Sequence, residues 1–522
     1  MTEGAIATPH VQATAAGRDA LAAGGNAIDA ALVAAAVLTV VYPHQCAIGG
    51  DLFALVHTAA GETFSVNGSG HLPKSVDVER LRGNGFDLPA NGPQSLTVPG
   101  MVAGWNSIAE LGGSFAPADV LASAIELAAG GMEVSSSLAA GIRAQSEVLA
   151  KDGGMRNVFF RRGRAVQEGE RIRQTALSRT LAALAEDGFD SFYAGEIAER
   201  LVGGLRSLGA EIGNEDLLGH RSEINTPLTY RYGEVELATS PPNSQGLALL
   251  QACAALDAIG IGMEELGEFA GEALCASLMA AGDRDRYLGD PRHADVPLDE
   301  LFDGARLERR LQRRLRQDAA RSSAGTAVSA HGDTVAVCAM DGDGNAVSII
   351  QSVYQTFGAG ILEADTGIIM HNRARGFSLV PGEPNEMIPG TRPAHTLMPL
   401  LLLRDGIPVA SLGTMGGRAQ PQILLQILPG TLDTTASDLA AGLAAPRWVF
   451  GGPDIGFDEP TVALEAGAPA ATVQKLALAR LPVIRVSARD ERMGHANVVR
   501  IASDGRLECA SDPRSDGLGL TV

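Results

Sequence analysis

The sequence predicts a mixed α/β protein in which helices and sheets are stacked in layers. Residues 117–210 are rich in alanine, leucine and glutamate with the spacing of amphipathic helices, whereas short apolar strands alternate with helices after Thr334. Hydrophobic residues make up 45% of the 522 residues and charged residues 20%, so we expect a sizeable core and little disorder. A helix-rich first part around a strand-rich second part favours an α/β/β/α order of layers.

Two helices are expected near the start of the chain. The first runs from Val11 to Ala23 and ends at a glycine pair, and Asn26 is a candidate N-cap for the second, Ala27–Val41. The apolar run at 30–41 is too short to span a bilayer, so we expect a buried helix there. A turn at 49–51 then leads into a strand at 52–56, with residues 64–66 as its hairpin partner.

The later elements follow from the same signals. We predict a helix at 101–111, a loop at 240–246 before a helix at 247–258, a basic helix at 307–316, strands at 367–370, 398–403 and 407–412, and a helix at 421–428. The arginines of the basic helix indicate a solvated face rather than a binding patch. Residues 321–331 are rich in serine, alanine and glycine and are expected to be flexible, as a processing site would need.

Charge and cysteine usage exclude several classes of protein. The net charge of −20 repels phosphate backbones, so nucleic acid is a poor partner. The five cysteines are scattered and lack CxxC spacing, which argues against a disulfide framework and a metal site. The N-terminus lacks the basic segment of a secretion signal. We therefore expect a cytoplasmic protein without a membrane span, a metal or another cofactor.

A predicted β-hairpin holds the residue of greatest interest. Residues 335–340 alternate as in a strand, 341–345 have turn chemistry, and 346–350 resume a strand. Thr334 is expected at the head of the first strand, after a small and polar lead-in. Such a threonine is more often structural than catalytic. Our hypothesis is that the chain is cut between Asp333 and Thr334 and that the freed threonine is a nucleophile.

The chemistry of an N-terminal threonine supports this hypothesis. A hydroxyl is a weak nucleophile unless a base lies beside it, and the α-amino group of Thr334 would supply that base. Its ordinary pKa of about 7.7–8.0 leaves neutral amine available near physiological pH. The hydroxyl itself could attack the Asp333 carbonyl to cut the chain. The backbone N–H groups of Gly416 and Gly417 are candidates for stabilising the oxyanion, although a glycine pair is usually just a turn.

Several motifs in order along the chain accompany these residues. They are Gly24-Gly25-Asn26-Ala27 with Asp29-Ala30-Ala31, Ile48-Gly49-Gly50-Asp51, Val98-Pro99-Gly100, Pro241-Pro242, Tyr287-Leu288-Gly289-Asp290-Pro291, Asp333-Thr334, Asp343-Gly344-Asn345-Ala346, Thr356-Phe357-Gly358, Arg392-Pro393, Gly416-Gly417 and Ser511-Asp512-Pro513-Arg514. With them the chain resembles the γ-glutamyltransferase family of self-processing N-terminal nucleophile hydrolases, from about residue 4 to residue 519.

This resemblance implies a fold and a set of catalytic roles. The fold would be an αββα sandwich built from a large subunit, residues 1–333, and a small subunit, residues 334–522. Thr334 would be nucleophile and base, and Gly416 and Gly417 would form the oxyanion hole. Ser352 stands where the family has a threonine whose hydroxyl bonds to the nucleophile, and serine keeps that hydroxyl.

The substrate pocket departs from the family pattern. Family members bind the α-carboxylate of glutamate with an arginine and two serines, and its α-amino group with Asn, Gln and Asp. The matching residues here are Ser69, then His395 and Thr396, then Tyr354, Arg373 and Gly376. A buried ammonium needs acceptors, and arginine offers none. The α-amino pocket is therefore expected to be lost, which favours an anionic or neutral acyl group.

Arg373, with or without Arg375, is a candidate for binding a carboxylate, the alternative being a solvated loop arginine. His395 and Tyr354 could contact substrate or merely pack. Only residues 380–391 occupy the place of the family's lid, so an open cleft is expected. The amino-acid sequence at 372–379 and 395–399 resembles that of the family branch that includes oxamate amidohydrolases.

The sequence thus predicts a proenzyme that hydrolyses or transfers the acyl group of a small anionic, oxamate-like amide. The alternatives are γ-glutamyl transfer or glutathione hydrolysis with an unusual pocket, and a non-catalytic scaffold. The expected partners are the small-molecule substrate and the two subunits of one precursor, with a homodimer of processed heterodimers left open.

Overall fold

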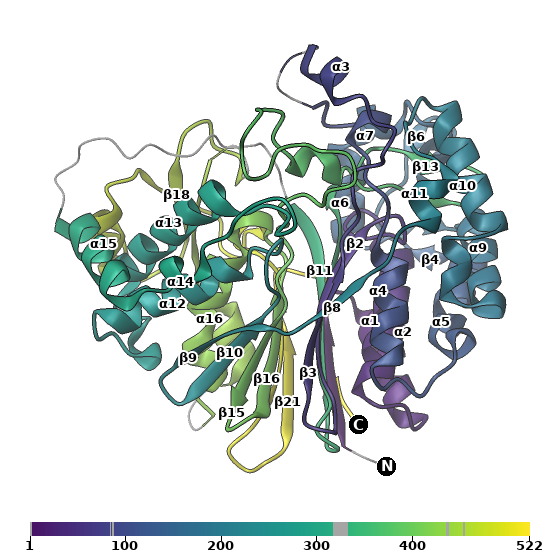
Figure 1. Ribbon diagram of the computed structural model, residues 1–522. Coiled ribbons are helices and arrows are strands. Elements are labelled where there is room, and N and C mark those ends of the chain that lie inside the picture. Colours follow the sequence, from purple (N-terminus) through teal and green to yellow (C-terminus); the bar gives the residue numbers. More distant parts are fainter. Residues whose placement is uncertain (1–2, 84, 86–87, 317–331, 435–437, 453–454) are drawn as a thin grey trace.

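Two β-sheets lie face to face, and helices cover the outer face of each (Figure 1). The computed structural model describes residues 3–83, 85, 88–316, 332–434, 438–452 and 455–522. The chain is thus a mixed α/β protein, as the sequence predicts. The segment at 321–331, for which flexibility was predicted, lies outside the described residues.

The first sheet has seven strands, antiparallel throughout. In spatial order they are β22 (Leu518–Thr521), β1 (Gly4–Thr8), β11 (Gly332–Asp341), β12 (Ala346–Gln355), β2 (Asp51–His57), β3 (Thr63–Gly68) and β8 (Glu223–Asn225). The predicted hairpin forms β11 and β12 at the centre of this sheet, and the predicted pairing of 52–56 with 64–66 is confirmed as β2 and β3.

The second sheet has six antiparallel strands. In spatial order they are β21 (Leu507–Ser511), β20 (Ala496–Ile501), β16 (Ile407–Thr414), β15 (Leu400–Arg404), β10 (Val235–Thr239) and β9 (Leu228–Tyr232). Leu55, Cys338, Leu401 and Val499 belong to an apolar layer that contains residues of both sheets. This layer joins the two sheets into one core.

Helices form the two outer layers (Figure 1). On the first sheet they include α1 (Val11–Ala22), α2 (Ala27–Val41), α4 (Met101–Glu110), α5 (Pro117–Gly130) and α9 (Thr175–Asp187). On the second they include α12 (Gly246–Ala258), α13 (Ala270–Tyr287), α15 (Gly304–Arg316) and α16 (Gln420–Leu432). Only two residues of α15, Leu307 and Leu311, are fully buried, which agrees with a largely solvated basic helix.

The helix α2 shows how the local sequence determines where a helix begins and whether it is buried. Asn26 caps it by accepting from the N–H groups of Ile28 and Asp29 at 2.9 and 3.0 Å, and Asp29 completes the capping box. Every residue of Ala27–Val41 is buried. A helix that is apolar all round must be buried on all sides, so the predicted buried helix is confirmed. No helix in the described part of the chain has the length and apolarity needed to span a membrane.

The remaining elements surround this frame. The helices are α3 (Val78–Gly83), α6 (Ser136–Ala144), α7 (Ser146–Leu149), α8 (Gly153–Phe159), α10 (Glu196–Ser207), α11 (Asn214–Leu218), α14 (Leu298–Leu301), α17 (Leu439–Ala444) and α18 (Ala470–Leu476). The short strands pair as β4 (Met132–Glu133) with β7 (Arg171–Ile172), β5 (Phe160–Arg161) with β6 (Arg164–Ala165), β13 (Leu362–Glu363) with β14 (Ile368–Ile369), and as a sheet of β17 (Trp448–Gly451), β18 (Thr461–Glu465) and β19 (Val483–Val486). The strand predicted at 367–370 is therefore only two residues long.

Both sheets mix strands from before and after residue 333. In the first sheet β1 pairs with β11, and in the second β10 pairs with β15. A break in the chain before Thr334 would leave each part holding strands of both sheets. The two parts would therefore stay together through backbone hydrogen bonds and the shared core.

Candidate functional site

Thr334 lies in an irregular stretch of the central strand pair. Asp333 pairs with Tyr354 but Val335 pairs with Gln351, so Thr334 is opposite two residues of β12. Such a β-bulge re-aims side chains and interrupts the hydrogen-bond ladder. Thr334 is buried, with 1% of its surface exposed. The expectation that it heads the strand is wrong by two residues, because the uncut chain continues the pairing back to Gly332.

Ser352 contacts the peptide bond that precedes Thr334. Its Oγ donates a hydrogen bond to the carbonyl oxygen of Asp333 at 2.5 Å and accepts one from the N–H of Tyr354 at 2.7 Å. The family resemblance implied a contact with the nucleophile instead. A donor on a carbonyl oxygen favours attack on that carbonyl, because negative charge develops on the oxygen.

The side chain of Asp333 is held on the same strand pair. Thr356 donates its hydroxyl to the Asp333 carboxyl. The pKa of Asp333 is raised to about 7, chiefly by burial and also by the nearby Glu491, against the opposing effect of the hydrogen bond from Thr356. The residue on the acyl side of the candidate cleavage site therefore changes charge near neutral pH.

Gly416 and Gly417 form a tight loop after β16. Their φ angles are 141° and 53°, which a side chain would strain, and a Cβ on Gly416 would lie 2.5 Å from Ile423 Cδ1. The short turn at Gly417–Ala419 contacts β11. The structure thus brings the two candidate oxyanion donors beside the strand that carries Thr334.

Gln245, which sequence reasoning missed, supports this glycine loop. Its Nε2 donates to the carbonyl oxygens of Gly417 at 2.7 Å and Thr396 at 2.6 Å, and its Oε1 accepts from Arg284 at 2.9 Å. It ends the loop that the sequence predicted before α12. The available signal was a polar, proline-rich loop leading into an apolar helix.

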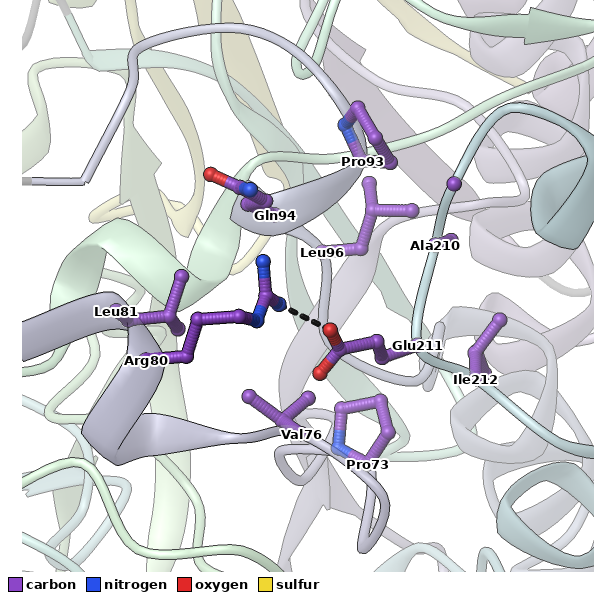
Figure 2. A pocket seen from close by; sticks show the side chains of 11 residues that line it. Pro73, Val76, Arg80, Leu81, Pro93, Gln94, Leu96, Ala210, Glu211 and Ile212 are labelled. Carbon is purple, nitrogen blue, oxygen red and sulfur yellow. Dashed lines mark hydrogen bonds and ion pairs between the residues drawn. The ribbon is translucent and has the colours of Figure 1, made fainter. Parts of the chain in front are cut away.

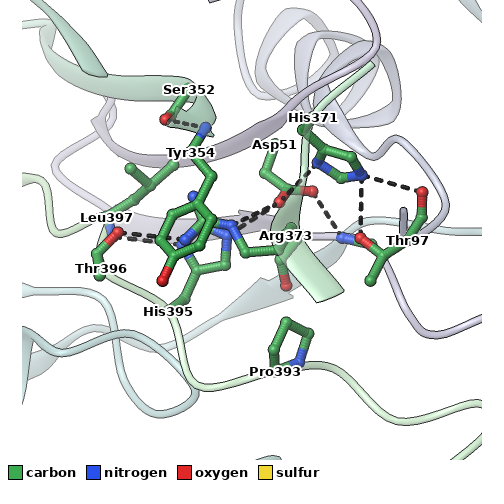
Figure 3. A network of polar contacts seen from close by, with 12 residues as sticks. Asp51, Thr97, Ser352, Tyr354, His371, Arg373, Pro393, His395, Thr396 and Leu397 are labelled. Carbon is green, nitrogen blue, oxygen red and sulfur yellow. Dashed lines mark hydrogen bonds and ion pairs between the residues drawn. The ribbon is translucent and has the colours of Figure 1, made fainter. Parts of the chain in front are cut away.

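Asp51 stands at the centre of a fully buried polar network (Figure 3). Its Oδ2 contacts His371 Nδ1 at 3.1 Å, Arg373 Nε at 3.2 Å and His395 Nε2 at 3.1 Å. Its Oδ1 accepts from the N–H of Gly70 at 2.9 Å. Burial alone would raise the pKa of Asp51, but His371 and His395 hold it well below its usual range. Asp51 and His371 were not predicted as site residues, although Asp51 closes the Gly49-Gly50-Asp51 motif.

His395 is neutral in this network. Burial and the charge of Arg373 lower its pKa to about 3, against the opposing effect of Asp51. Its Nδ1 accepts from the N–H of Leu397 at 3.3 Å, so Nε2 carries the proton that points to Asp51. The ring therefore acts as a fixed donor to Asp51.

One nitrogen of the Arg373 guanidinium has no hydrogen-bond partner among the described residues. Its Nε contacts Asp51 and its Nη1 donates to the Thr396 hydroxyl at 3.3 Å, but its buried Nη2 has no hydrogen-bond partner among the described residues. The guanidinium carbon lies 4.0 Å from the centre of the Tyr354 ring. The two side chains lie next to each other in Figure 3. Tyr354 itself has a φ of 78°, which is a strained conformation for a bulky residue.

A cleft of about 550 Å³ opens next to this network. Three predicted substrate residues, Tyr354, His395 and Thr396, line it. Its other walls combine apolar side chains, including Leu288, Phe377 and Leu379, with the arginines Arg284, Arg375 and Arg418. Val380, Glu383 and Asn385, from the segment that replaces a lid, form part of its lining.

Ser69 is not brought to the cleft. It is fully buried, its hydroxyl donates to Asn67 Oδ1 at 2.7 Å, and Arg392 donates to its carbonyl oxygen at 2.5 Å. A separate pocket, of about 20 Å³, lies where Arg80 pairs with Glu211 (Figure 2). That pocket has room for little more than one water and is lined by none of the predicted site residues.

Comparisons with known proteins identify the family of this chain. The family model described as gamma-glutamyltranspeptidase matches residues 13–522. The chain is 35% identical to the glutathione hydrolase-like YwrD proenzyme of Bacillus subtilis, covering 100% of this chain and 99% of that one. It is 34% identical to the oxamate amidohydrolase proenzyme of Klebsiella pneumoniae, covering 99% and 98%.

A solved structure is similar to this chain in its fold as well as in its sequence. The cephalosporin acylase of Bacillus halodurans superposes with a TM-score of 0.89 at 32% identity, covering 99% of this chain and 96% of that chain. Sequence and fold agree over essentially the whole length. The chain therefore belongs to the gamma-glutamyltranspeptidase family and is an enzyme that acts on amide bonds.

Proposed function

We propose that this protein is a proenzyme that cuts itself between Asp333 and Thr334 and then uses Thr334 to hydrolyse an amide with a small anionic acyl group. The mature enzyme would consist of residues 1–333 and 334–522 within one αββα N-terminal nucleophile hydrolase sandwich. The observation that supports this best is the hydrogen bond from Ser352 to the Asp333 carbonyl, immediately before the buried Thr334. The relatives named as proenzymes are consistent with it.

Self-cleavage would follow from this geometry in two steps. Thr334 Oγ1 attacks the Asp333 carbonyl carbon, the C–N bond breaks, and the freed nitrogen takes the hydroxyl proton, which leaves an ester between Asp333 and Thr334. Water then hydrolyses the ester to the Asp333 carboxylate and a free Thr334 hydroxyl. Ser352 stabilises the oxyanion in both steps, because it already donates to that oxygen.

The processed enzyme would repeat the same chemistry on its substrate. The free α-amino group of Thr334 takes the hydroxyl proton, and Oγ1 attacks the substrate amide. The N–H groups of Gly416 and Gly417, in a loop supported by Gln245, are the oxyanion donors. The amine leaves with the proton, and water or an acceptor amine releases the acyl group.

The network around Arg373 supports an anionic acyl group. Arg373 Nη2 is buried and has no hydrogen-bond partner in the described part of the chain, and such a donor favours an anion. Asp51 neutralises part of the guanidinium charge, so we expect a single charge-assisted hydrogen bond rather than a two-pronged one. Thr396, which accepts from Arg373, and His395 line the cleft and would contact the same end of the substrate.

The second candidate is γ-glutamyl transfer or glutathione hydrolysis, because relatives that match this chain carry the name glutathione hydrolase. The Tyr354 and Arg373 side chains argue against it, since neither offers a carboxylate or amide acceptor to an α-ammonium group. A non-catalytic scaffold would not need Thr334 or, in contact with its strand, a loop whose two positive φ angles require glycine.

Two measurements test this proposal. Purified wild type should migrate as two bands and Thr334→Ala as one, and a wild type that stays whole on long incubation would refute self-cleavage. Turnover of oxamate beside a γ-glutamyl anilide separates the two substrate classes. Efficient turnover of the anilide alone would overturn the assignment of an anionic acyl group while leaving the nucleophile intact.

A further inference from the structure

Asn497, a buried residue of β20, points into the layer between the two sheets, and the buried His495 immediately precedes this strand. Asn497 is directly opposite Gly413 on β16, and opposite residues of an antiparallel pair share a face. A Cβ on Gly413 would lie 2.8 Å from the Ala336 Cβ of β11, so this face looks toward the first sheet. Asn497 therefore faces the strand of the nucleophile, and Cys338 donates to its carbonyl oxygen at 3.2 Å.

His495 lies two residues earlier, just before β20 begins, on the side of Asn497 that leads toward the Thr334 end of β11. On β16, Ser411 donates to the carbonyl oxygen of Val347, whose partner on β11 is Ala339. Gly413, two residues further along β16, packs against Ala336 of β11. Met415, two residues after Gly413 and just past the end of β16, continues this progression along β11 toward Thr334. The N–H of Met415 donates to the His495 carbonyl at 3.1 Å, so His495 is held where β16 runs into the Gly416–Gly417 loop.

Four polar atoms of these two side chains have no hydrogen-bond partner among the described residues. They are Nδ1 and Nε2 of His495 and Oδ1 and Nδ2 of Asn497, and the two side chains are 1% and 0% exposed. Buried polar atoms in native proteins are almost always paired, by ordered water where the protein supplies no partner. Four such atoms, on two side chains that are two residues apart in the chain, indicate a site that binds water.

A third buried histidine, from the first part of the chain, is electrostatically linked to this site. His44 has a buried ring nitrogen, Nδ1, without a partner in the described structure, and the presence of His495 contributes to lowering the pKa of His44. Its carbonyl oxygen accepts from the N–H of Phe357, just beyond the end of β12. Burial lowers the pKa of His44 to about 3 and that of His495 to about 4, so both rings are neutral and can donate to water and accept from it.

We propose that His495 and Asn497 hold ordered water beside Thr334, and that this water hydrolyses the esters formed on the Thr334 hydroxyl. The proposal rests on the self-cleaving threonine of the proposed function. The water oxygen bonds to the ester carbonyl carbon, its proton passes to the Thr334 nitrogen, the bond from that carbon to Oγ1 breaks, and the proton returns to Oγ1. The products are a carboxylic acid and a free threonine. His495 and Asn497 are positioning residues in this step.

The test compares self-cleavage in water and in hydroxylamine. Asn497→Leu keeps the volume of the side chain but cannot hold water. We expect the precursor of this variant to be cut about ten times more slowly than the wild-type precursor. Added hydroxylamine should restore the wild-type rate, because it attacks the ester without needing a binding site that holds it. Ser411→Ala is the matched control, because Ser411 faces the same layer but its hydroxyl is already paired with Val347. It should be cut at the wild-type rate.

Each outcome decides between explanations. Cleavage of a folded Asn497→Leu at the wild-type rate, or slow cleavage that hydroxylamine does not restore, would overturn the water site. If Asn497→Leu does not fold, His495→Leu undergoes the same comparison. A crystal structure of the Thr334→Ala precursor gives a direct answer, since a site without water at His495 and Asn497 would also overturn it. A wild type that hydroxylamine and water both leave uncut would instead refute the self-cleaving threonine itself.

Discussion

Replacing Ser352 with alanine tests the central contact of the proposed cleavage site. The Ser352 hydroxyl donates to the Asp333 carbonyl oxygen at 2.5 Å, the oxygen that would bear negative charge during attack by Thr334. Removing one preorganised donor to a developing oxyanion costs about 2.7–4 kcal/mol of transition-state stabilisation. We therefore expect Ser352→Ala to slow self-cleavage by about 10²–10³-fold.

A separate loss of stability accompanies this change. The Asp333 carbonyl and the Tyr354 N–H both lose a buried partner, at about 1–3 kcal/mol for each unsatisfied group. Ser348→Ala is a suitable control, because Ser348 is buried on the same strand and donates to Leu412 at 2.7 Å. It should lose stability by a similar mechanism without affecting cleavage.

The assay is the decay of the full-length band of purified precursor with time, beside a thermal unfolding curve for each variant. Ser352→Thr keeps a hydroxyl and should restore most of the rate. If Ser352→Ala is cut within about two-fold of the wild-type rate while folded, the hydroxyl is not an oxyanion donor and our reasoning is refuted.

Three further predictions follow from the same contacts. Arg373→Lys keeps a charge beside Asp51 but loses Nη2, so KM for oxamate should rise about ten-fold; an unchanged kcat/KM would remove Arg373 from substrate binding. In a Thr334→Ala precursor, the raised pKa of Asp333, about 7, means that the folded state binds this proton more tightly than the unfolded state. Stability should then fall from about pH 4 to pH 7, by at most about 1.4 kcal/mol per pH unit, and Asp333→Asn should remove that part of the profile in pH-dependent unfolding. Gln245→Ala should lower kcat about ten-fold, because it frees the carbonyl of Gly417; an equal loss in kcat for Gln251→Ala, which changes a buried glutamine of α12 that contacts Asp283, would point to general destabilisation instead.

The sequence predicted local elements well where one physical signal dominates. The helix α2 follows from an Asn26 cap and an uninterrupted apolar run, and the central hairpin follows from alternation on either side of a turn. Chemistry-bearing motifs also stood out locally, such as the glycine pair at Gly416 and Gly417. These features depend on neighbours in the chain, which a sequence displays directly.

The folded structure places some of the predicted pocket residues at the cleft and others away from it. Tyr354, His395 and Thr396 line the cleft, whereas Ser69 is turned away and Arg373 lies behind Tyr354. Alignment with a family assigns each residue a place along the chain. It cannot tell which way a side chain points after its neighbours have been replaced.

Three contacts were beyond sequence reasoning altogether. Asp51 meets His371 and His395 across more than 300 positions of the chain, and Gln245 reaches Gly417 across 172 positions. None of these pairs has a spacing that any local pattern would reveal. Their residue types are also common in ordinary loops and helix ends.

By itself the sequence determined the class of fold, the candidate nucleophile Thr334 and the glycine loop, because cap, turn and strand signals act over a few residues. The tertiary structure alone decided that Thr334 lies in a bulge under Ser352 and that Arg373 shares its charge with Asp51. It also decided that Asn497 faces the nucleophile strand and that Asn497 and His495 carry buried polar atoms without a partner among the described residues. Those facts depend on the register between strands and on burial from all sides. Both arise only when segments hundreds of residues apart pack together.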